Sequence, residues 1–114
     1  MSNYSTGHKA EVYAEKYLKK MKFKIIALNF KTRRYEIDII AQKNKCLHFV
    51  EIKYRQTADQ GTGFDYITDN KLKQMKYAAE MWVSEHDWQG EYVLSAIEMT
   101  GDDYRVTNFI QTIV

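Results

Sequence analysis

The sequence has no proline and a single cysteine among its 114 residues. No linker, repeat or low-complexity tract divides it, so residues 1–114 are expected to form one domain. Cys46 alone excludes, within one chain, a disulfide framework and a cysteine-rich zinc site. No apolar run approaches the roughly 20 residues that a membrane-spanning helix needs, and polar residues follow Met1. We therefore expect a cytoplasmic protein that has no membrane partner.

Neither positive nor negative charge predominates, because the formal net charge is only +2. This balance permits a nucleic-acid partner but does not argue for one. The composition is 45% hydrophobic and 14% aromatic, which excludes a disordered chain and allows a real core. Basic residues nevertheless gather in two short clusters, which are Lys19, Lys20, Lys22 and Lys24, and Lys31, Arg33 and Arg34.

Apolar periodicity predicts a helix, three strands, a second helix and one or two further strands. Segregated strands flanked by helices predict an α/β layered domain whose central sheet is covered on both faces. The first helix starts at Ser5 or Thr6 and ends near Met21, and Thr68 or Asp69 caps the second, after a loop containing Gly61 and Gly63. The expected strands are residues 23–30, two strands within 33–55 joined near 43–46, residues 92–99 and residues 104–109.

The second and third strands carry charges where buried strands usually carry apolar residues. They read RRYEIDIIAQKNKCLHFVEIKYR over residues 33–55, with Glu36 and Asp38 in one strand and Glu51 and Lys53 in the next. With a loop at 43–46, residues whose numbers sum to 89 pair across the hairpin, which sets Asp38 opposite Glu51 and Glu36 opposite Lys53. A tighter loop instead sets Glu36 opposite Glu51, with Asp38 on the diagonal.

Opposed carboxylates on a covered face need a partner of positive charge. Directly opposed side chains have Cβ atoms about 4.5–5.5 Å apart, so two ionised acids would repel each other and lose hydration. A divalent cation such as Mg²⁺ would offset this cost. Glu11, beside the apolar stripe of the first helix, adds a third acid. The alternative is an ordinary solvated strand face, since E-x-K triplets and cross-strand acid–base pairs are common.

The ordered motifs Gly7-x-x-x-Glu11, Glu36-Ile37-Asp38 and Glu51-Ile52-Lys53-x-Arg55 carry a resemblance. Together with GHKAEVYAEKYL and ITDNKLKQMKYAAEMW, the chain resembles the YraN-like family of small bacterial proteins. That family is placed in the PD-(D/E)xK restriction-endonuclease-like superfamily and is similar to archaeal Holliday junction resolvases. The resemblance implies a three-layer domain with an α-β-β-β-α-β core and a mixed central sheet.

The resemblance also implies a catalytic set, which is Glu11, Asp38, Glu51 and Lys53. Asp38 and Glu51 would hold Mg²⁺ or Mn²⁺, with the carbonyl of Ile52 as a third ligand. Glu11 would orient a bound water or complete a second metal site, and Lys53 would position the attacking water. These roles predict hydrolysis of DNA phosphodiester bonds, with recognition of branched or structured DNA rather than of base sequence.

Two positions depart from the family pattern. The family usually has glycine before the glutamate of its EID motif, where this chain has Tyr35. Near the C-terminal strand the family often reads FDVV, whereas this chain reads YVLSAI without the aspartate. Neither departure removes a residue of the predicted metal-binding set.

The expected partner is nucleic acid, contacted through phosphates by Lys31, Arg33, Arg34 and Arg55. The alternative for these residues is a solvated basic rim. A module on a nuclease fold that binds nucleic acid or protein without cutting is the second functional hypothesis. The sequence leaves the oligomeric state open, and a homodimer is compatible with it.

Overall fold

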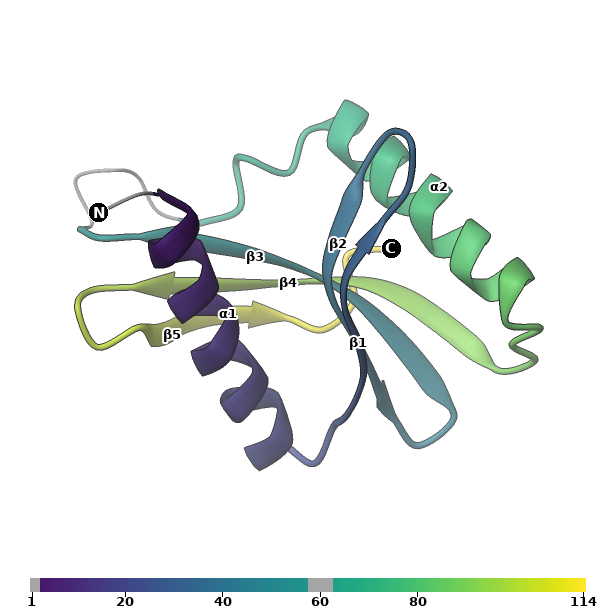
Figure 1. Ribbon diagram of the computed structural model, residues 1–114, viewed down its shortest axis with the longest axis horizontal. Coiled ribbons are helices and arrows are strands. Elements are labelled where there is room, and N and C mark those ends of the chain that lie inside the picture. The colour runs from purple at the N-terminus through teal and green to yellow at the C-terminus, as the bar shows by residue number, and fades with distance from the viewer. Residues whose placement is uncertain (1–2, 58–62) are drawn as a thin grey trace.

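A five-stranded mixed sheet forms the centre of the molecule, and one helix packs on each of its faces (Figure 1). The computed structural model describes residues 3–57 and 63–114. Strands follow the order β1-β2-β3-β4-β5, in which β3 and β4 are parallel and the other neighbours antiparallel. The elements are α1 (Asn3–Lys20), β1 (Lys24–Lys31), β2 (Glu36–Lys43), β3 (Cys46–Arg55), α2 (Asp69–Glu85), β4 (Glu91–Thr100) and β5 (Arg105–Ile110). The predicted α/β class and α-β-β-β-α-β core are confirmed.

Two apolar cores lie on opposite sides of the sheet, as the double coverage predicted. Their members alternate along the strands because successive side chains point to opposite faces. The α1 side contains Ala10, Ala14, Leu18, Phe23, Ile39, Ala41, Val50, Ile97 and Met99. The α2 side contains Ile37, Ile40, Leu47, Phe49, Met75, Ala78, Ala79 and Leu94.

Both helices occur where the sequence predicted them. Helix α1 starts at Asn3, so Ser5 and Thr6 lie inside it rather than before it. The helix ends at Lys20, one residue before the predicted end near Met21, and Met21 is 36% exposed. Helix α2 is capped by Thr68, whose Oγ1 accepts a hydrogen bond from the Lys71 N–H at 3.1 Å.

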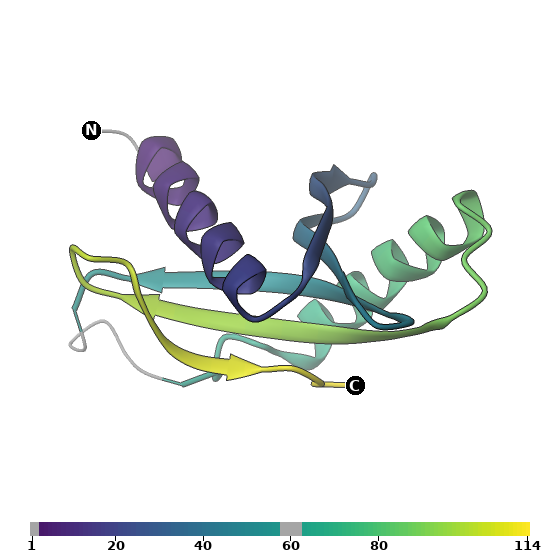
Figure 2. The same cartoon turned by 90° about the horizontal axis from the view of Figure 1, so that it is seen from below.

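Of the two registers that the sequence left open, the β2–β3 hairpin adopts the one in which paired residue numbers sum to 89. The ladder runs from Lys43 opposite Cys46 to Ile39 opposite Val50. It ends there, because the β1–β2 hairpin rises away from the rest of the sheet (Figure 2). The predicted strand pairs Asp38–Glu51 and Glu36–Lys53 are therefore not part of the ladder, and Glu36 pairs with Lys31 of β1. The two strands therefore diverge beyond the Ile39–Val50 pair, at Asp38 in β2 and Glu51 in β3.

The C-terminal strands β4 and β5 also match their predicted ranges to within a residue or two. Gly101 opens the turn between them with a φ of +84°, which favours glycine. Gly61, placed in the loop before α2, lies outside the described residues. Neither described helix combines the length and apolar character that crossing a membrane would require.

Candidate functional site

Asp38 lies where β2 and β3 diverge. Its Oδ2 accepts a hydrogen bond of 2.8 Å from the N–H of Ile52. A side chain thus replaces the backbone partner that a continuing ladder would have supplied. Because the N–H and C=O of one strand residue point to the same neighbour, the Ile52 carbonyl also faces this fork between the strands. The fork thus brings together Asp38, Glu51 and the backbone of Ile52.

The carboxyl group of Asp38 is short of positive charge. Burial, together with the nearby Glu51 charge, raises its pKa to about 7. The Ile52 N–H lowers this pKa in part, whereas the charges of Glu11 and Glu36 raise it again. A buried acid whose pKa is raised by a neighbouring acid is a common mark of a functional site. It is also the environment in which a cation would bind favourably.

Glu51 is only 8% exposed and is held by two side chains that the sequence did not assign to the site. Its Oε1 accepts a hydrogen bond from the Tyr35 hydroxyl, and its Oε2 lies 2.9 Å from Lys71 Nζ. Burial and Glu51 raise the pKa of Tyr35, so its hydroxyl remains a donor. Tyr35, the residue that departs from the family glycine, therefore contacts the acid pair directly.

Three cationic side chains lie over the aromatic ring of Tyr66, close to Glu51. The ammonium groups of Lys53 and Lys71 and the guanidinium of Arg55 each lie 5.5 Å from the centre of its ring. Such distances are typical of cation–π contacts. The Tyr66 hydroxyl is buried and has no hydrogen-bond partner among the described residues. Lys71 of α2 thus contacts Glu51 directly, and Lys53 lies over the same tyrosine ring.

Glu11 approaches the acid pair from α1 but is bound elsewhere. Its Oε1 accepts a hydrogen bond of 2.9 Å from Asn29 Nδ2 on β1. Within residues 3–57 and 63–114, no three His, Cys, Asp or Glu side chains form a group able to hold a metal. Glu11 therefore acts on Asp38 through its charge in this arrangement, and not as a third carboxylate beside Asp38 and Glu51.

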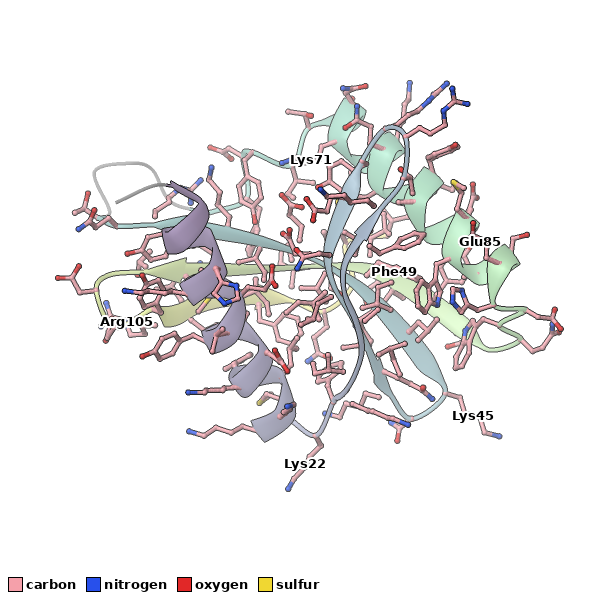
Figure 3. The ribbon with its side chains drawn as sticks, in the orientation of Figure 1. Lys22, Lys45, Phe49, Lys71, Glu85 and Arg105 are labelled. Carbon is pink, nitrogen blue, oxygen red and sulfur yellow. The ribbon has the colours of Figure 1, made fainter. Side chains whose placement is uncertain are left out.

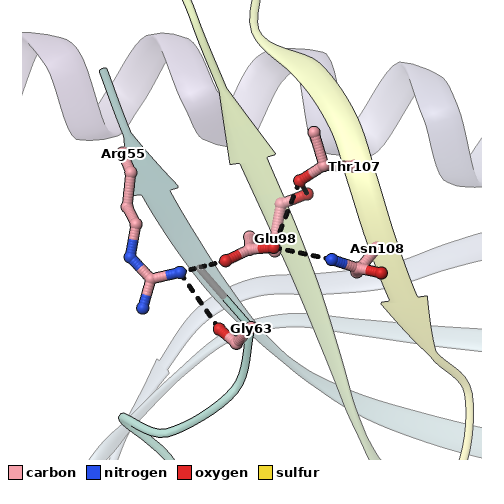
Figure 4. A network of polar contacts seen from close by, with 5 residues as sticks. All are labelled: Arg55, Gly63, Glu98, Thr107 and Asn108. Carbon is pink, nitrogen blue, oxygen red and sulfur yellow. Dashed lines mark hydrogen bonds and ion pairs between the residues drawn. The ribbon is translucent and has the colours of Figure 1, made fainter. Parts of the chain in front are cut away.

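Arg55 does not belong to the exposed basic residues with which the sequence grouped it. It is 7% exposed, forms an ion pair with Glu98 of β4 and donates a 3.0 Å hydrogen bond to the Gly63 carbonyl (Figure 4). Glu98 also accepts hydrogen bonds from Asn108 and Thr107. The sequence signal for Glu98 was an acid within the apolar run of β4. Arg55 therefore stabilises the sheet and the loop that leads to Tyr66.

The other predicted basic residues, Lys31, Arg33 and Arg34, are exposed at the β1–β2 turn. Thr32 orders this turn, since its Oγ1 accepts hydrogen bonds from the N–H groups of Arg34 and Tyr35. Tyr35 is thereby directed to Glu51, and Arg34 lies over the ring of Tyr77 on α2. Figure 3 shows Lys71 near the β1–β2 hairpin and Lys45 at the far end of the molecule.

A separate groove of about 710 Å³ lies at that far end and contains none of these acids. Cys46 and His48 both line it. Burial raises the pKa of the Cys46 thiol. Nδ1 of His48 forms a hydrogen bond of 2.9 Å with Ser95 Oγ. Because its pKa is raised, the Cys46 thiol is not an activated nucleophile.

The sequence profile of the uncharacterised protein family UPF0102 matches residues 10–105. The chain belongs to this family. A UPF0102 protein of Cytophaga hutchinsonii is 31% identical over 106 residues, which cover 93% of this chain and 94% of that protein. A UPF0102 protein of Photobacterium profundum is 30% identical over 95% of this chain and 89% of its own length. A UPF0102 protein of Aliarcobacter butzleri is 34% identical over 84% of this chain and 86% of its own length.

The UPF0102 match is consistent with the YraN-like resemblance that the motifs carry. The matched segment contains Glu11, Asp38, Glu51 and Lys53, and also Tyr35, Tyr66 and Lys71. All the side chains found around the fork thus lie within the part of the chain that the family profile covers.

The raised pKa of Asp38 predicts a pH-dependent stability. The folded pKa of about 7 exceeds the usual unfolded value of about 3.9, so the folded state holds an extra proton between them. The stabilisation from this proton is complete below about pH 4 and is lost as pH rises through about 7. Without metal, the free energy of unfolding should fall across this window by about 4 kcal/mol more in wild type than in Asp38→Asn, since one pKa unit corresponds to about 1.4 kcal/mol.

Urea unfolding at a series of pH values measures this difference. In Asp38→Asn the amide oxygen would still accept the Ile52 N–H, and the repulsion with Glu51 would be gone, so this variant should be the more stable protein at pH 8. The control is Asp103→Asn, because Asp103 is 66% exposed and should leave the wild-type pH profile unchanged. Parallel profiles for wild type and Asp38→Asn would contradict the raised pKa.

Proposed function

We propose that this protein is a metal-dependent endonuclease that hydrolyses phosphodiester bonds of branched or otherwise structured DNA. The observation that carries the proposal is the acid pair Asp38 and Glu51 at the strand fork. The pKa of Asp38 is raised, Lys71 pairs with Glu51, and Lys53 lies over the same tyrosine ring as Lys71. The motif resemblance to restriction-endonuclease-like proteins supports it, because the element order agrees with the implied core. Fold likeness alone does not establish activity, so the site must carry the argument.

The fork fits a hard divalent cation. Asp38 and Glu51 offer carboxylate oxygens, and the Ile52 carbonyl faces the same space. Mg²⁺ is commonly held by one or two carboxylates and keeps several waters, so a third acid is not needed. Asp38, Glu51 and Ile52 would hold Mg²⁺ or Mn²⁺, which supplies polarisation of a phosphate oxygen and a bound water of lowered pKa.

Lys53 and Lys71 provide positive charge on the same side of the fork. Both ammonium groups contact Tyr66, and Lys71 already neutralises Glu51. Lys53 positions the attacking water and offsets negative charge that develops on the phosphate. Lys71 adds a second cation, and Glu11, fixed by Asn29, orients a water next to Asp38. Lys31, Arg33 and Arg34 at the β1–β2 turn contact backbone phosphates of the DNA.

The second candidate is a module that binds DNA without cutting it. It is favoured by one observation, which is that both oxygens of Glu51 already have protein partners. In that case Tyr35 and Lys71 complete a structural network, and the fork needs no cation. The two candidates differ in whether a divalent metal stabilises the folded protein and whether DNA is cleaved.

A nicking assay on labelled single-stranded, duplex and branched DNA separates them. We expect cleavage with Mg²⁺ or Mn²⁺, none in EDTA, and faster cleavage of branched DNA than of duplex. Binding measured in EDTA at several salt concentrations is the parallel readout, and phosphate contacts should make it fall steeply with salt. Salt-dependent binding without cleavage under any metal would replace the endonuclease with the binding module.

A further inference from the structure

A polar groove of about 350 Å³ lies between the β1–β2 turn and α2. This volume falls in the range of small ligand sites, roughly 300–1,000 Å³. One wall is Arg34, and the other is a stripe along α2 at spacings of three and four residues, which places its members on one helix face. The residues that line this α2 groove are Arg34, Asn70, Lys73, Gln74 and Tyr77.

The α2 groove has the chemistry of a nucleotide site. Arg34 and Lys73 are cations suited to a phosphate, Asn70 and Gln74 carry amides that pair with base edges, and Tyr77 presents an aromatic ring. The Arg34 guanidinium lies 5.4 Å from the centre of that ring, a distance typical of a cation–π contact. None of the described lining residues is acidic, so nothing in the groove repels a phosphate.

Each wall of the α2 groove contains a residue whose neighbour in the sequence contacts Glu51. Arg34 precedes Tyr35, whose hydroxyl donates to Glu51. Asn70 precedes Lys71, whose Nζ lies 2.9 Å from Glu51 Oε2. The same turn and the same helix end thus present one residue to the fork and the next to the groove. A DNA strand that reaches the fork passes the groove within a short length of backbone.

We propose that the α2 groove binds one unpaired nucleotide of a DNA strand beside the phosphate held at Asp38 and Glu51. The base stacks on Tyr77 and the Arg34 guanidinium, Asn70 and Gln74 contact its edge, and Lys73 contacts its phosphate. A paired base would not be free to stack in this way, so the groove selects DNA with an unpaired strand next to the cleavage position. This inference rests on the proposed function and adds the substrate class.

Fluorescence anisotropy in EDTA tests the groove without any cleavage. The probes are a labelled oligothymidine and a blunt duplex of the same length, and the variants are Tyr77→Leu and Gln74→Ala. Tyr77→Leu keeps an apolar side chain but removes the ring, and should weaken oligothymidine binding by about tenfold, the scale of base–aromatic stacking. Duplex binding should change little, because its bases stay stacked.

Arg34→Ala should weaken both probes, and more strongly the oligothymidine, because Arg34 supplies charge and stacking. The matched control is Arg105→Ala, which removes an arginine that is 66% exposed on β5, away from the groove. It should leave the preference between the two probes unchanged. Melting temperatures close to wild type establish that each variant is folded.

The proposal is overturned if Tyr77→Leu and Gln74→Ala bind oligothymidine as wild type does, or lose oligothymidine and duplex equally. It is also overturned if wild type binds neither probe, which would remove DNA as the partner altogether. Failure of the endonuclease proposal gives a different result. In that case wild type cleaves nothing with Mn²⁺, yet Tyr77→Leu still weakens oligothymidine binding selectively.

Discussion

Asp38→Ala and Lys53→Ala should each lower Mn²⁺-dependent cleavage by about 10²–10³-fold, the usual cost of removing one preorganised electrostatic group. Asp38→Ala removes a carboxylate from a fork that has only two. Lys53→Ala removes an ammonium group that lies 5.5 Å from the Tyr66 ring centre. This is the group proposed to position the attacking water. Initial rates of nicking at saturating Mn²⁺ are the measurement.

The controls for these variants address folding and charge. Asp38→Ala leaves the Ile52 N–H without its 2.8 Å acceptor, so its loss of activity is compared with Asp38→Asn, which keeps an acceptor. Lys45→Ala removes an exposed lysine at the far end of the sheet and should cut as wild type does (Figure 3). Cleavage that persists in both Asp38→Ala and Lys53→Ala would place the chemistry elsewhere or outside this protein.

Lys71→Ala distinguishes the two lysines at the fork. Lys71 is paired with Glu51 before any metal binds, so its removal frees a carboxylate for the cation. We therefore expect tighter Mn²⁺ binding by calorimetry together with slower cleavage, whereas Lys53→Ala should slow cleavage without tightening Mn²⁺ binding. The two variants should differ in metal affinity because Lys71 forms an ion pair with Glu51, whereas Lys53 contacts Tyr66.

The sequence predicted the elements and the hairpin register well, because both follow from local periodicity. Alternation with period two and the turn at Asn44 and Lys45 determine which residues of β2 and β3 face each other. It did not predict where the β2–β3 ladder ends. The two strands separate beyond the Ile39–Val50 pair, at Asp38 and Glu51, and this depends on how the β1–β2 hairpin packs. The same divergence is what leaves Asp38 free to bind the Ile52 backbone.

The side chains around Glu51 could not be found from local pattern. Tyr35, Tyr66 and Lys71 come from a turn, a loop and a helix that only the folded chain brings to β3. The sequence predicted that Arg55 contacts phosphates together with Lys31, Arg33 and Arg34, because the predicted hairpin places all four near one end. The partner of Arg55, Glu98, lies on β4, which is distant in sequence and adjacent only through the parallel pairing of β3 and β4.

Glu98→Ala should lower the free energy of unfolding by about 3–5 kcal/mol, the usual cost of leaving one member of a buried ion pair unpaired. Arg55 is 7% exposed and Glu98 1% exposed, so water cannot replace the lost partner. For a domain of this size the melting temperature should fall by roughly 10–20 °C. Urea and thermal unfolding at neutral pH provide both values.

The matched control is the exposed ion pair of Arg105 and Asp103, in which both side chains are 66% exposed. Asp103→Ala should cost less than about 1 kcal/mol, because exposed pairs are weak and screened. The double variant Arg55→Met with Glu98→Leu should recover much of the lost stability, since apolar side chains can replace a buried ion pair. It should also loosen the loop at Gly63, because the hydrogen bond from Arg55 is lost.

The result also decides the role of Arg55. If Glu98→Ala is as stable as Asp103→Ala, the Arg55–Glu98 pair is not desolvated in solution, and Arg55 would be available to DNA phosphates as the sequence predicted. If Glu98→Ala is strongly destabilised, Arg55 is committed to the sheet. Phosphate contacts then come from the exposed β1–β2 turn, and the salt dependence of DNA binding should change with Arg33→Ala but not with the Arg55→Met, Glu98→Leu pair.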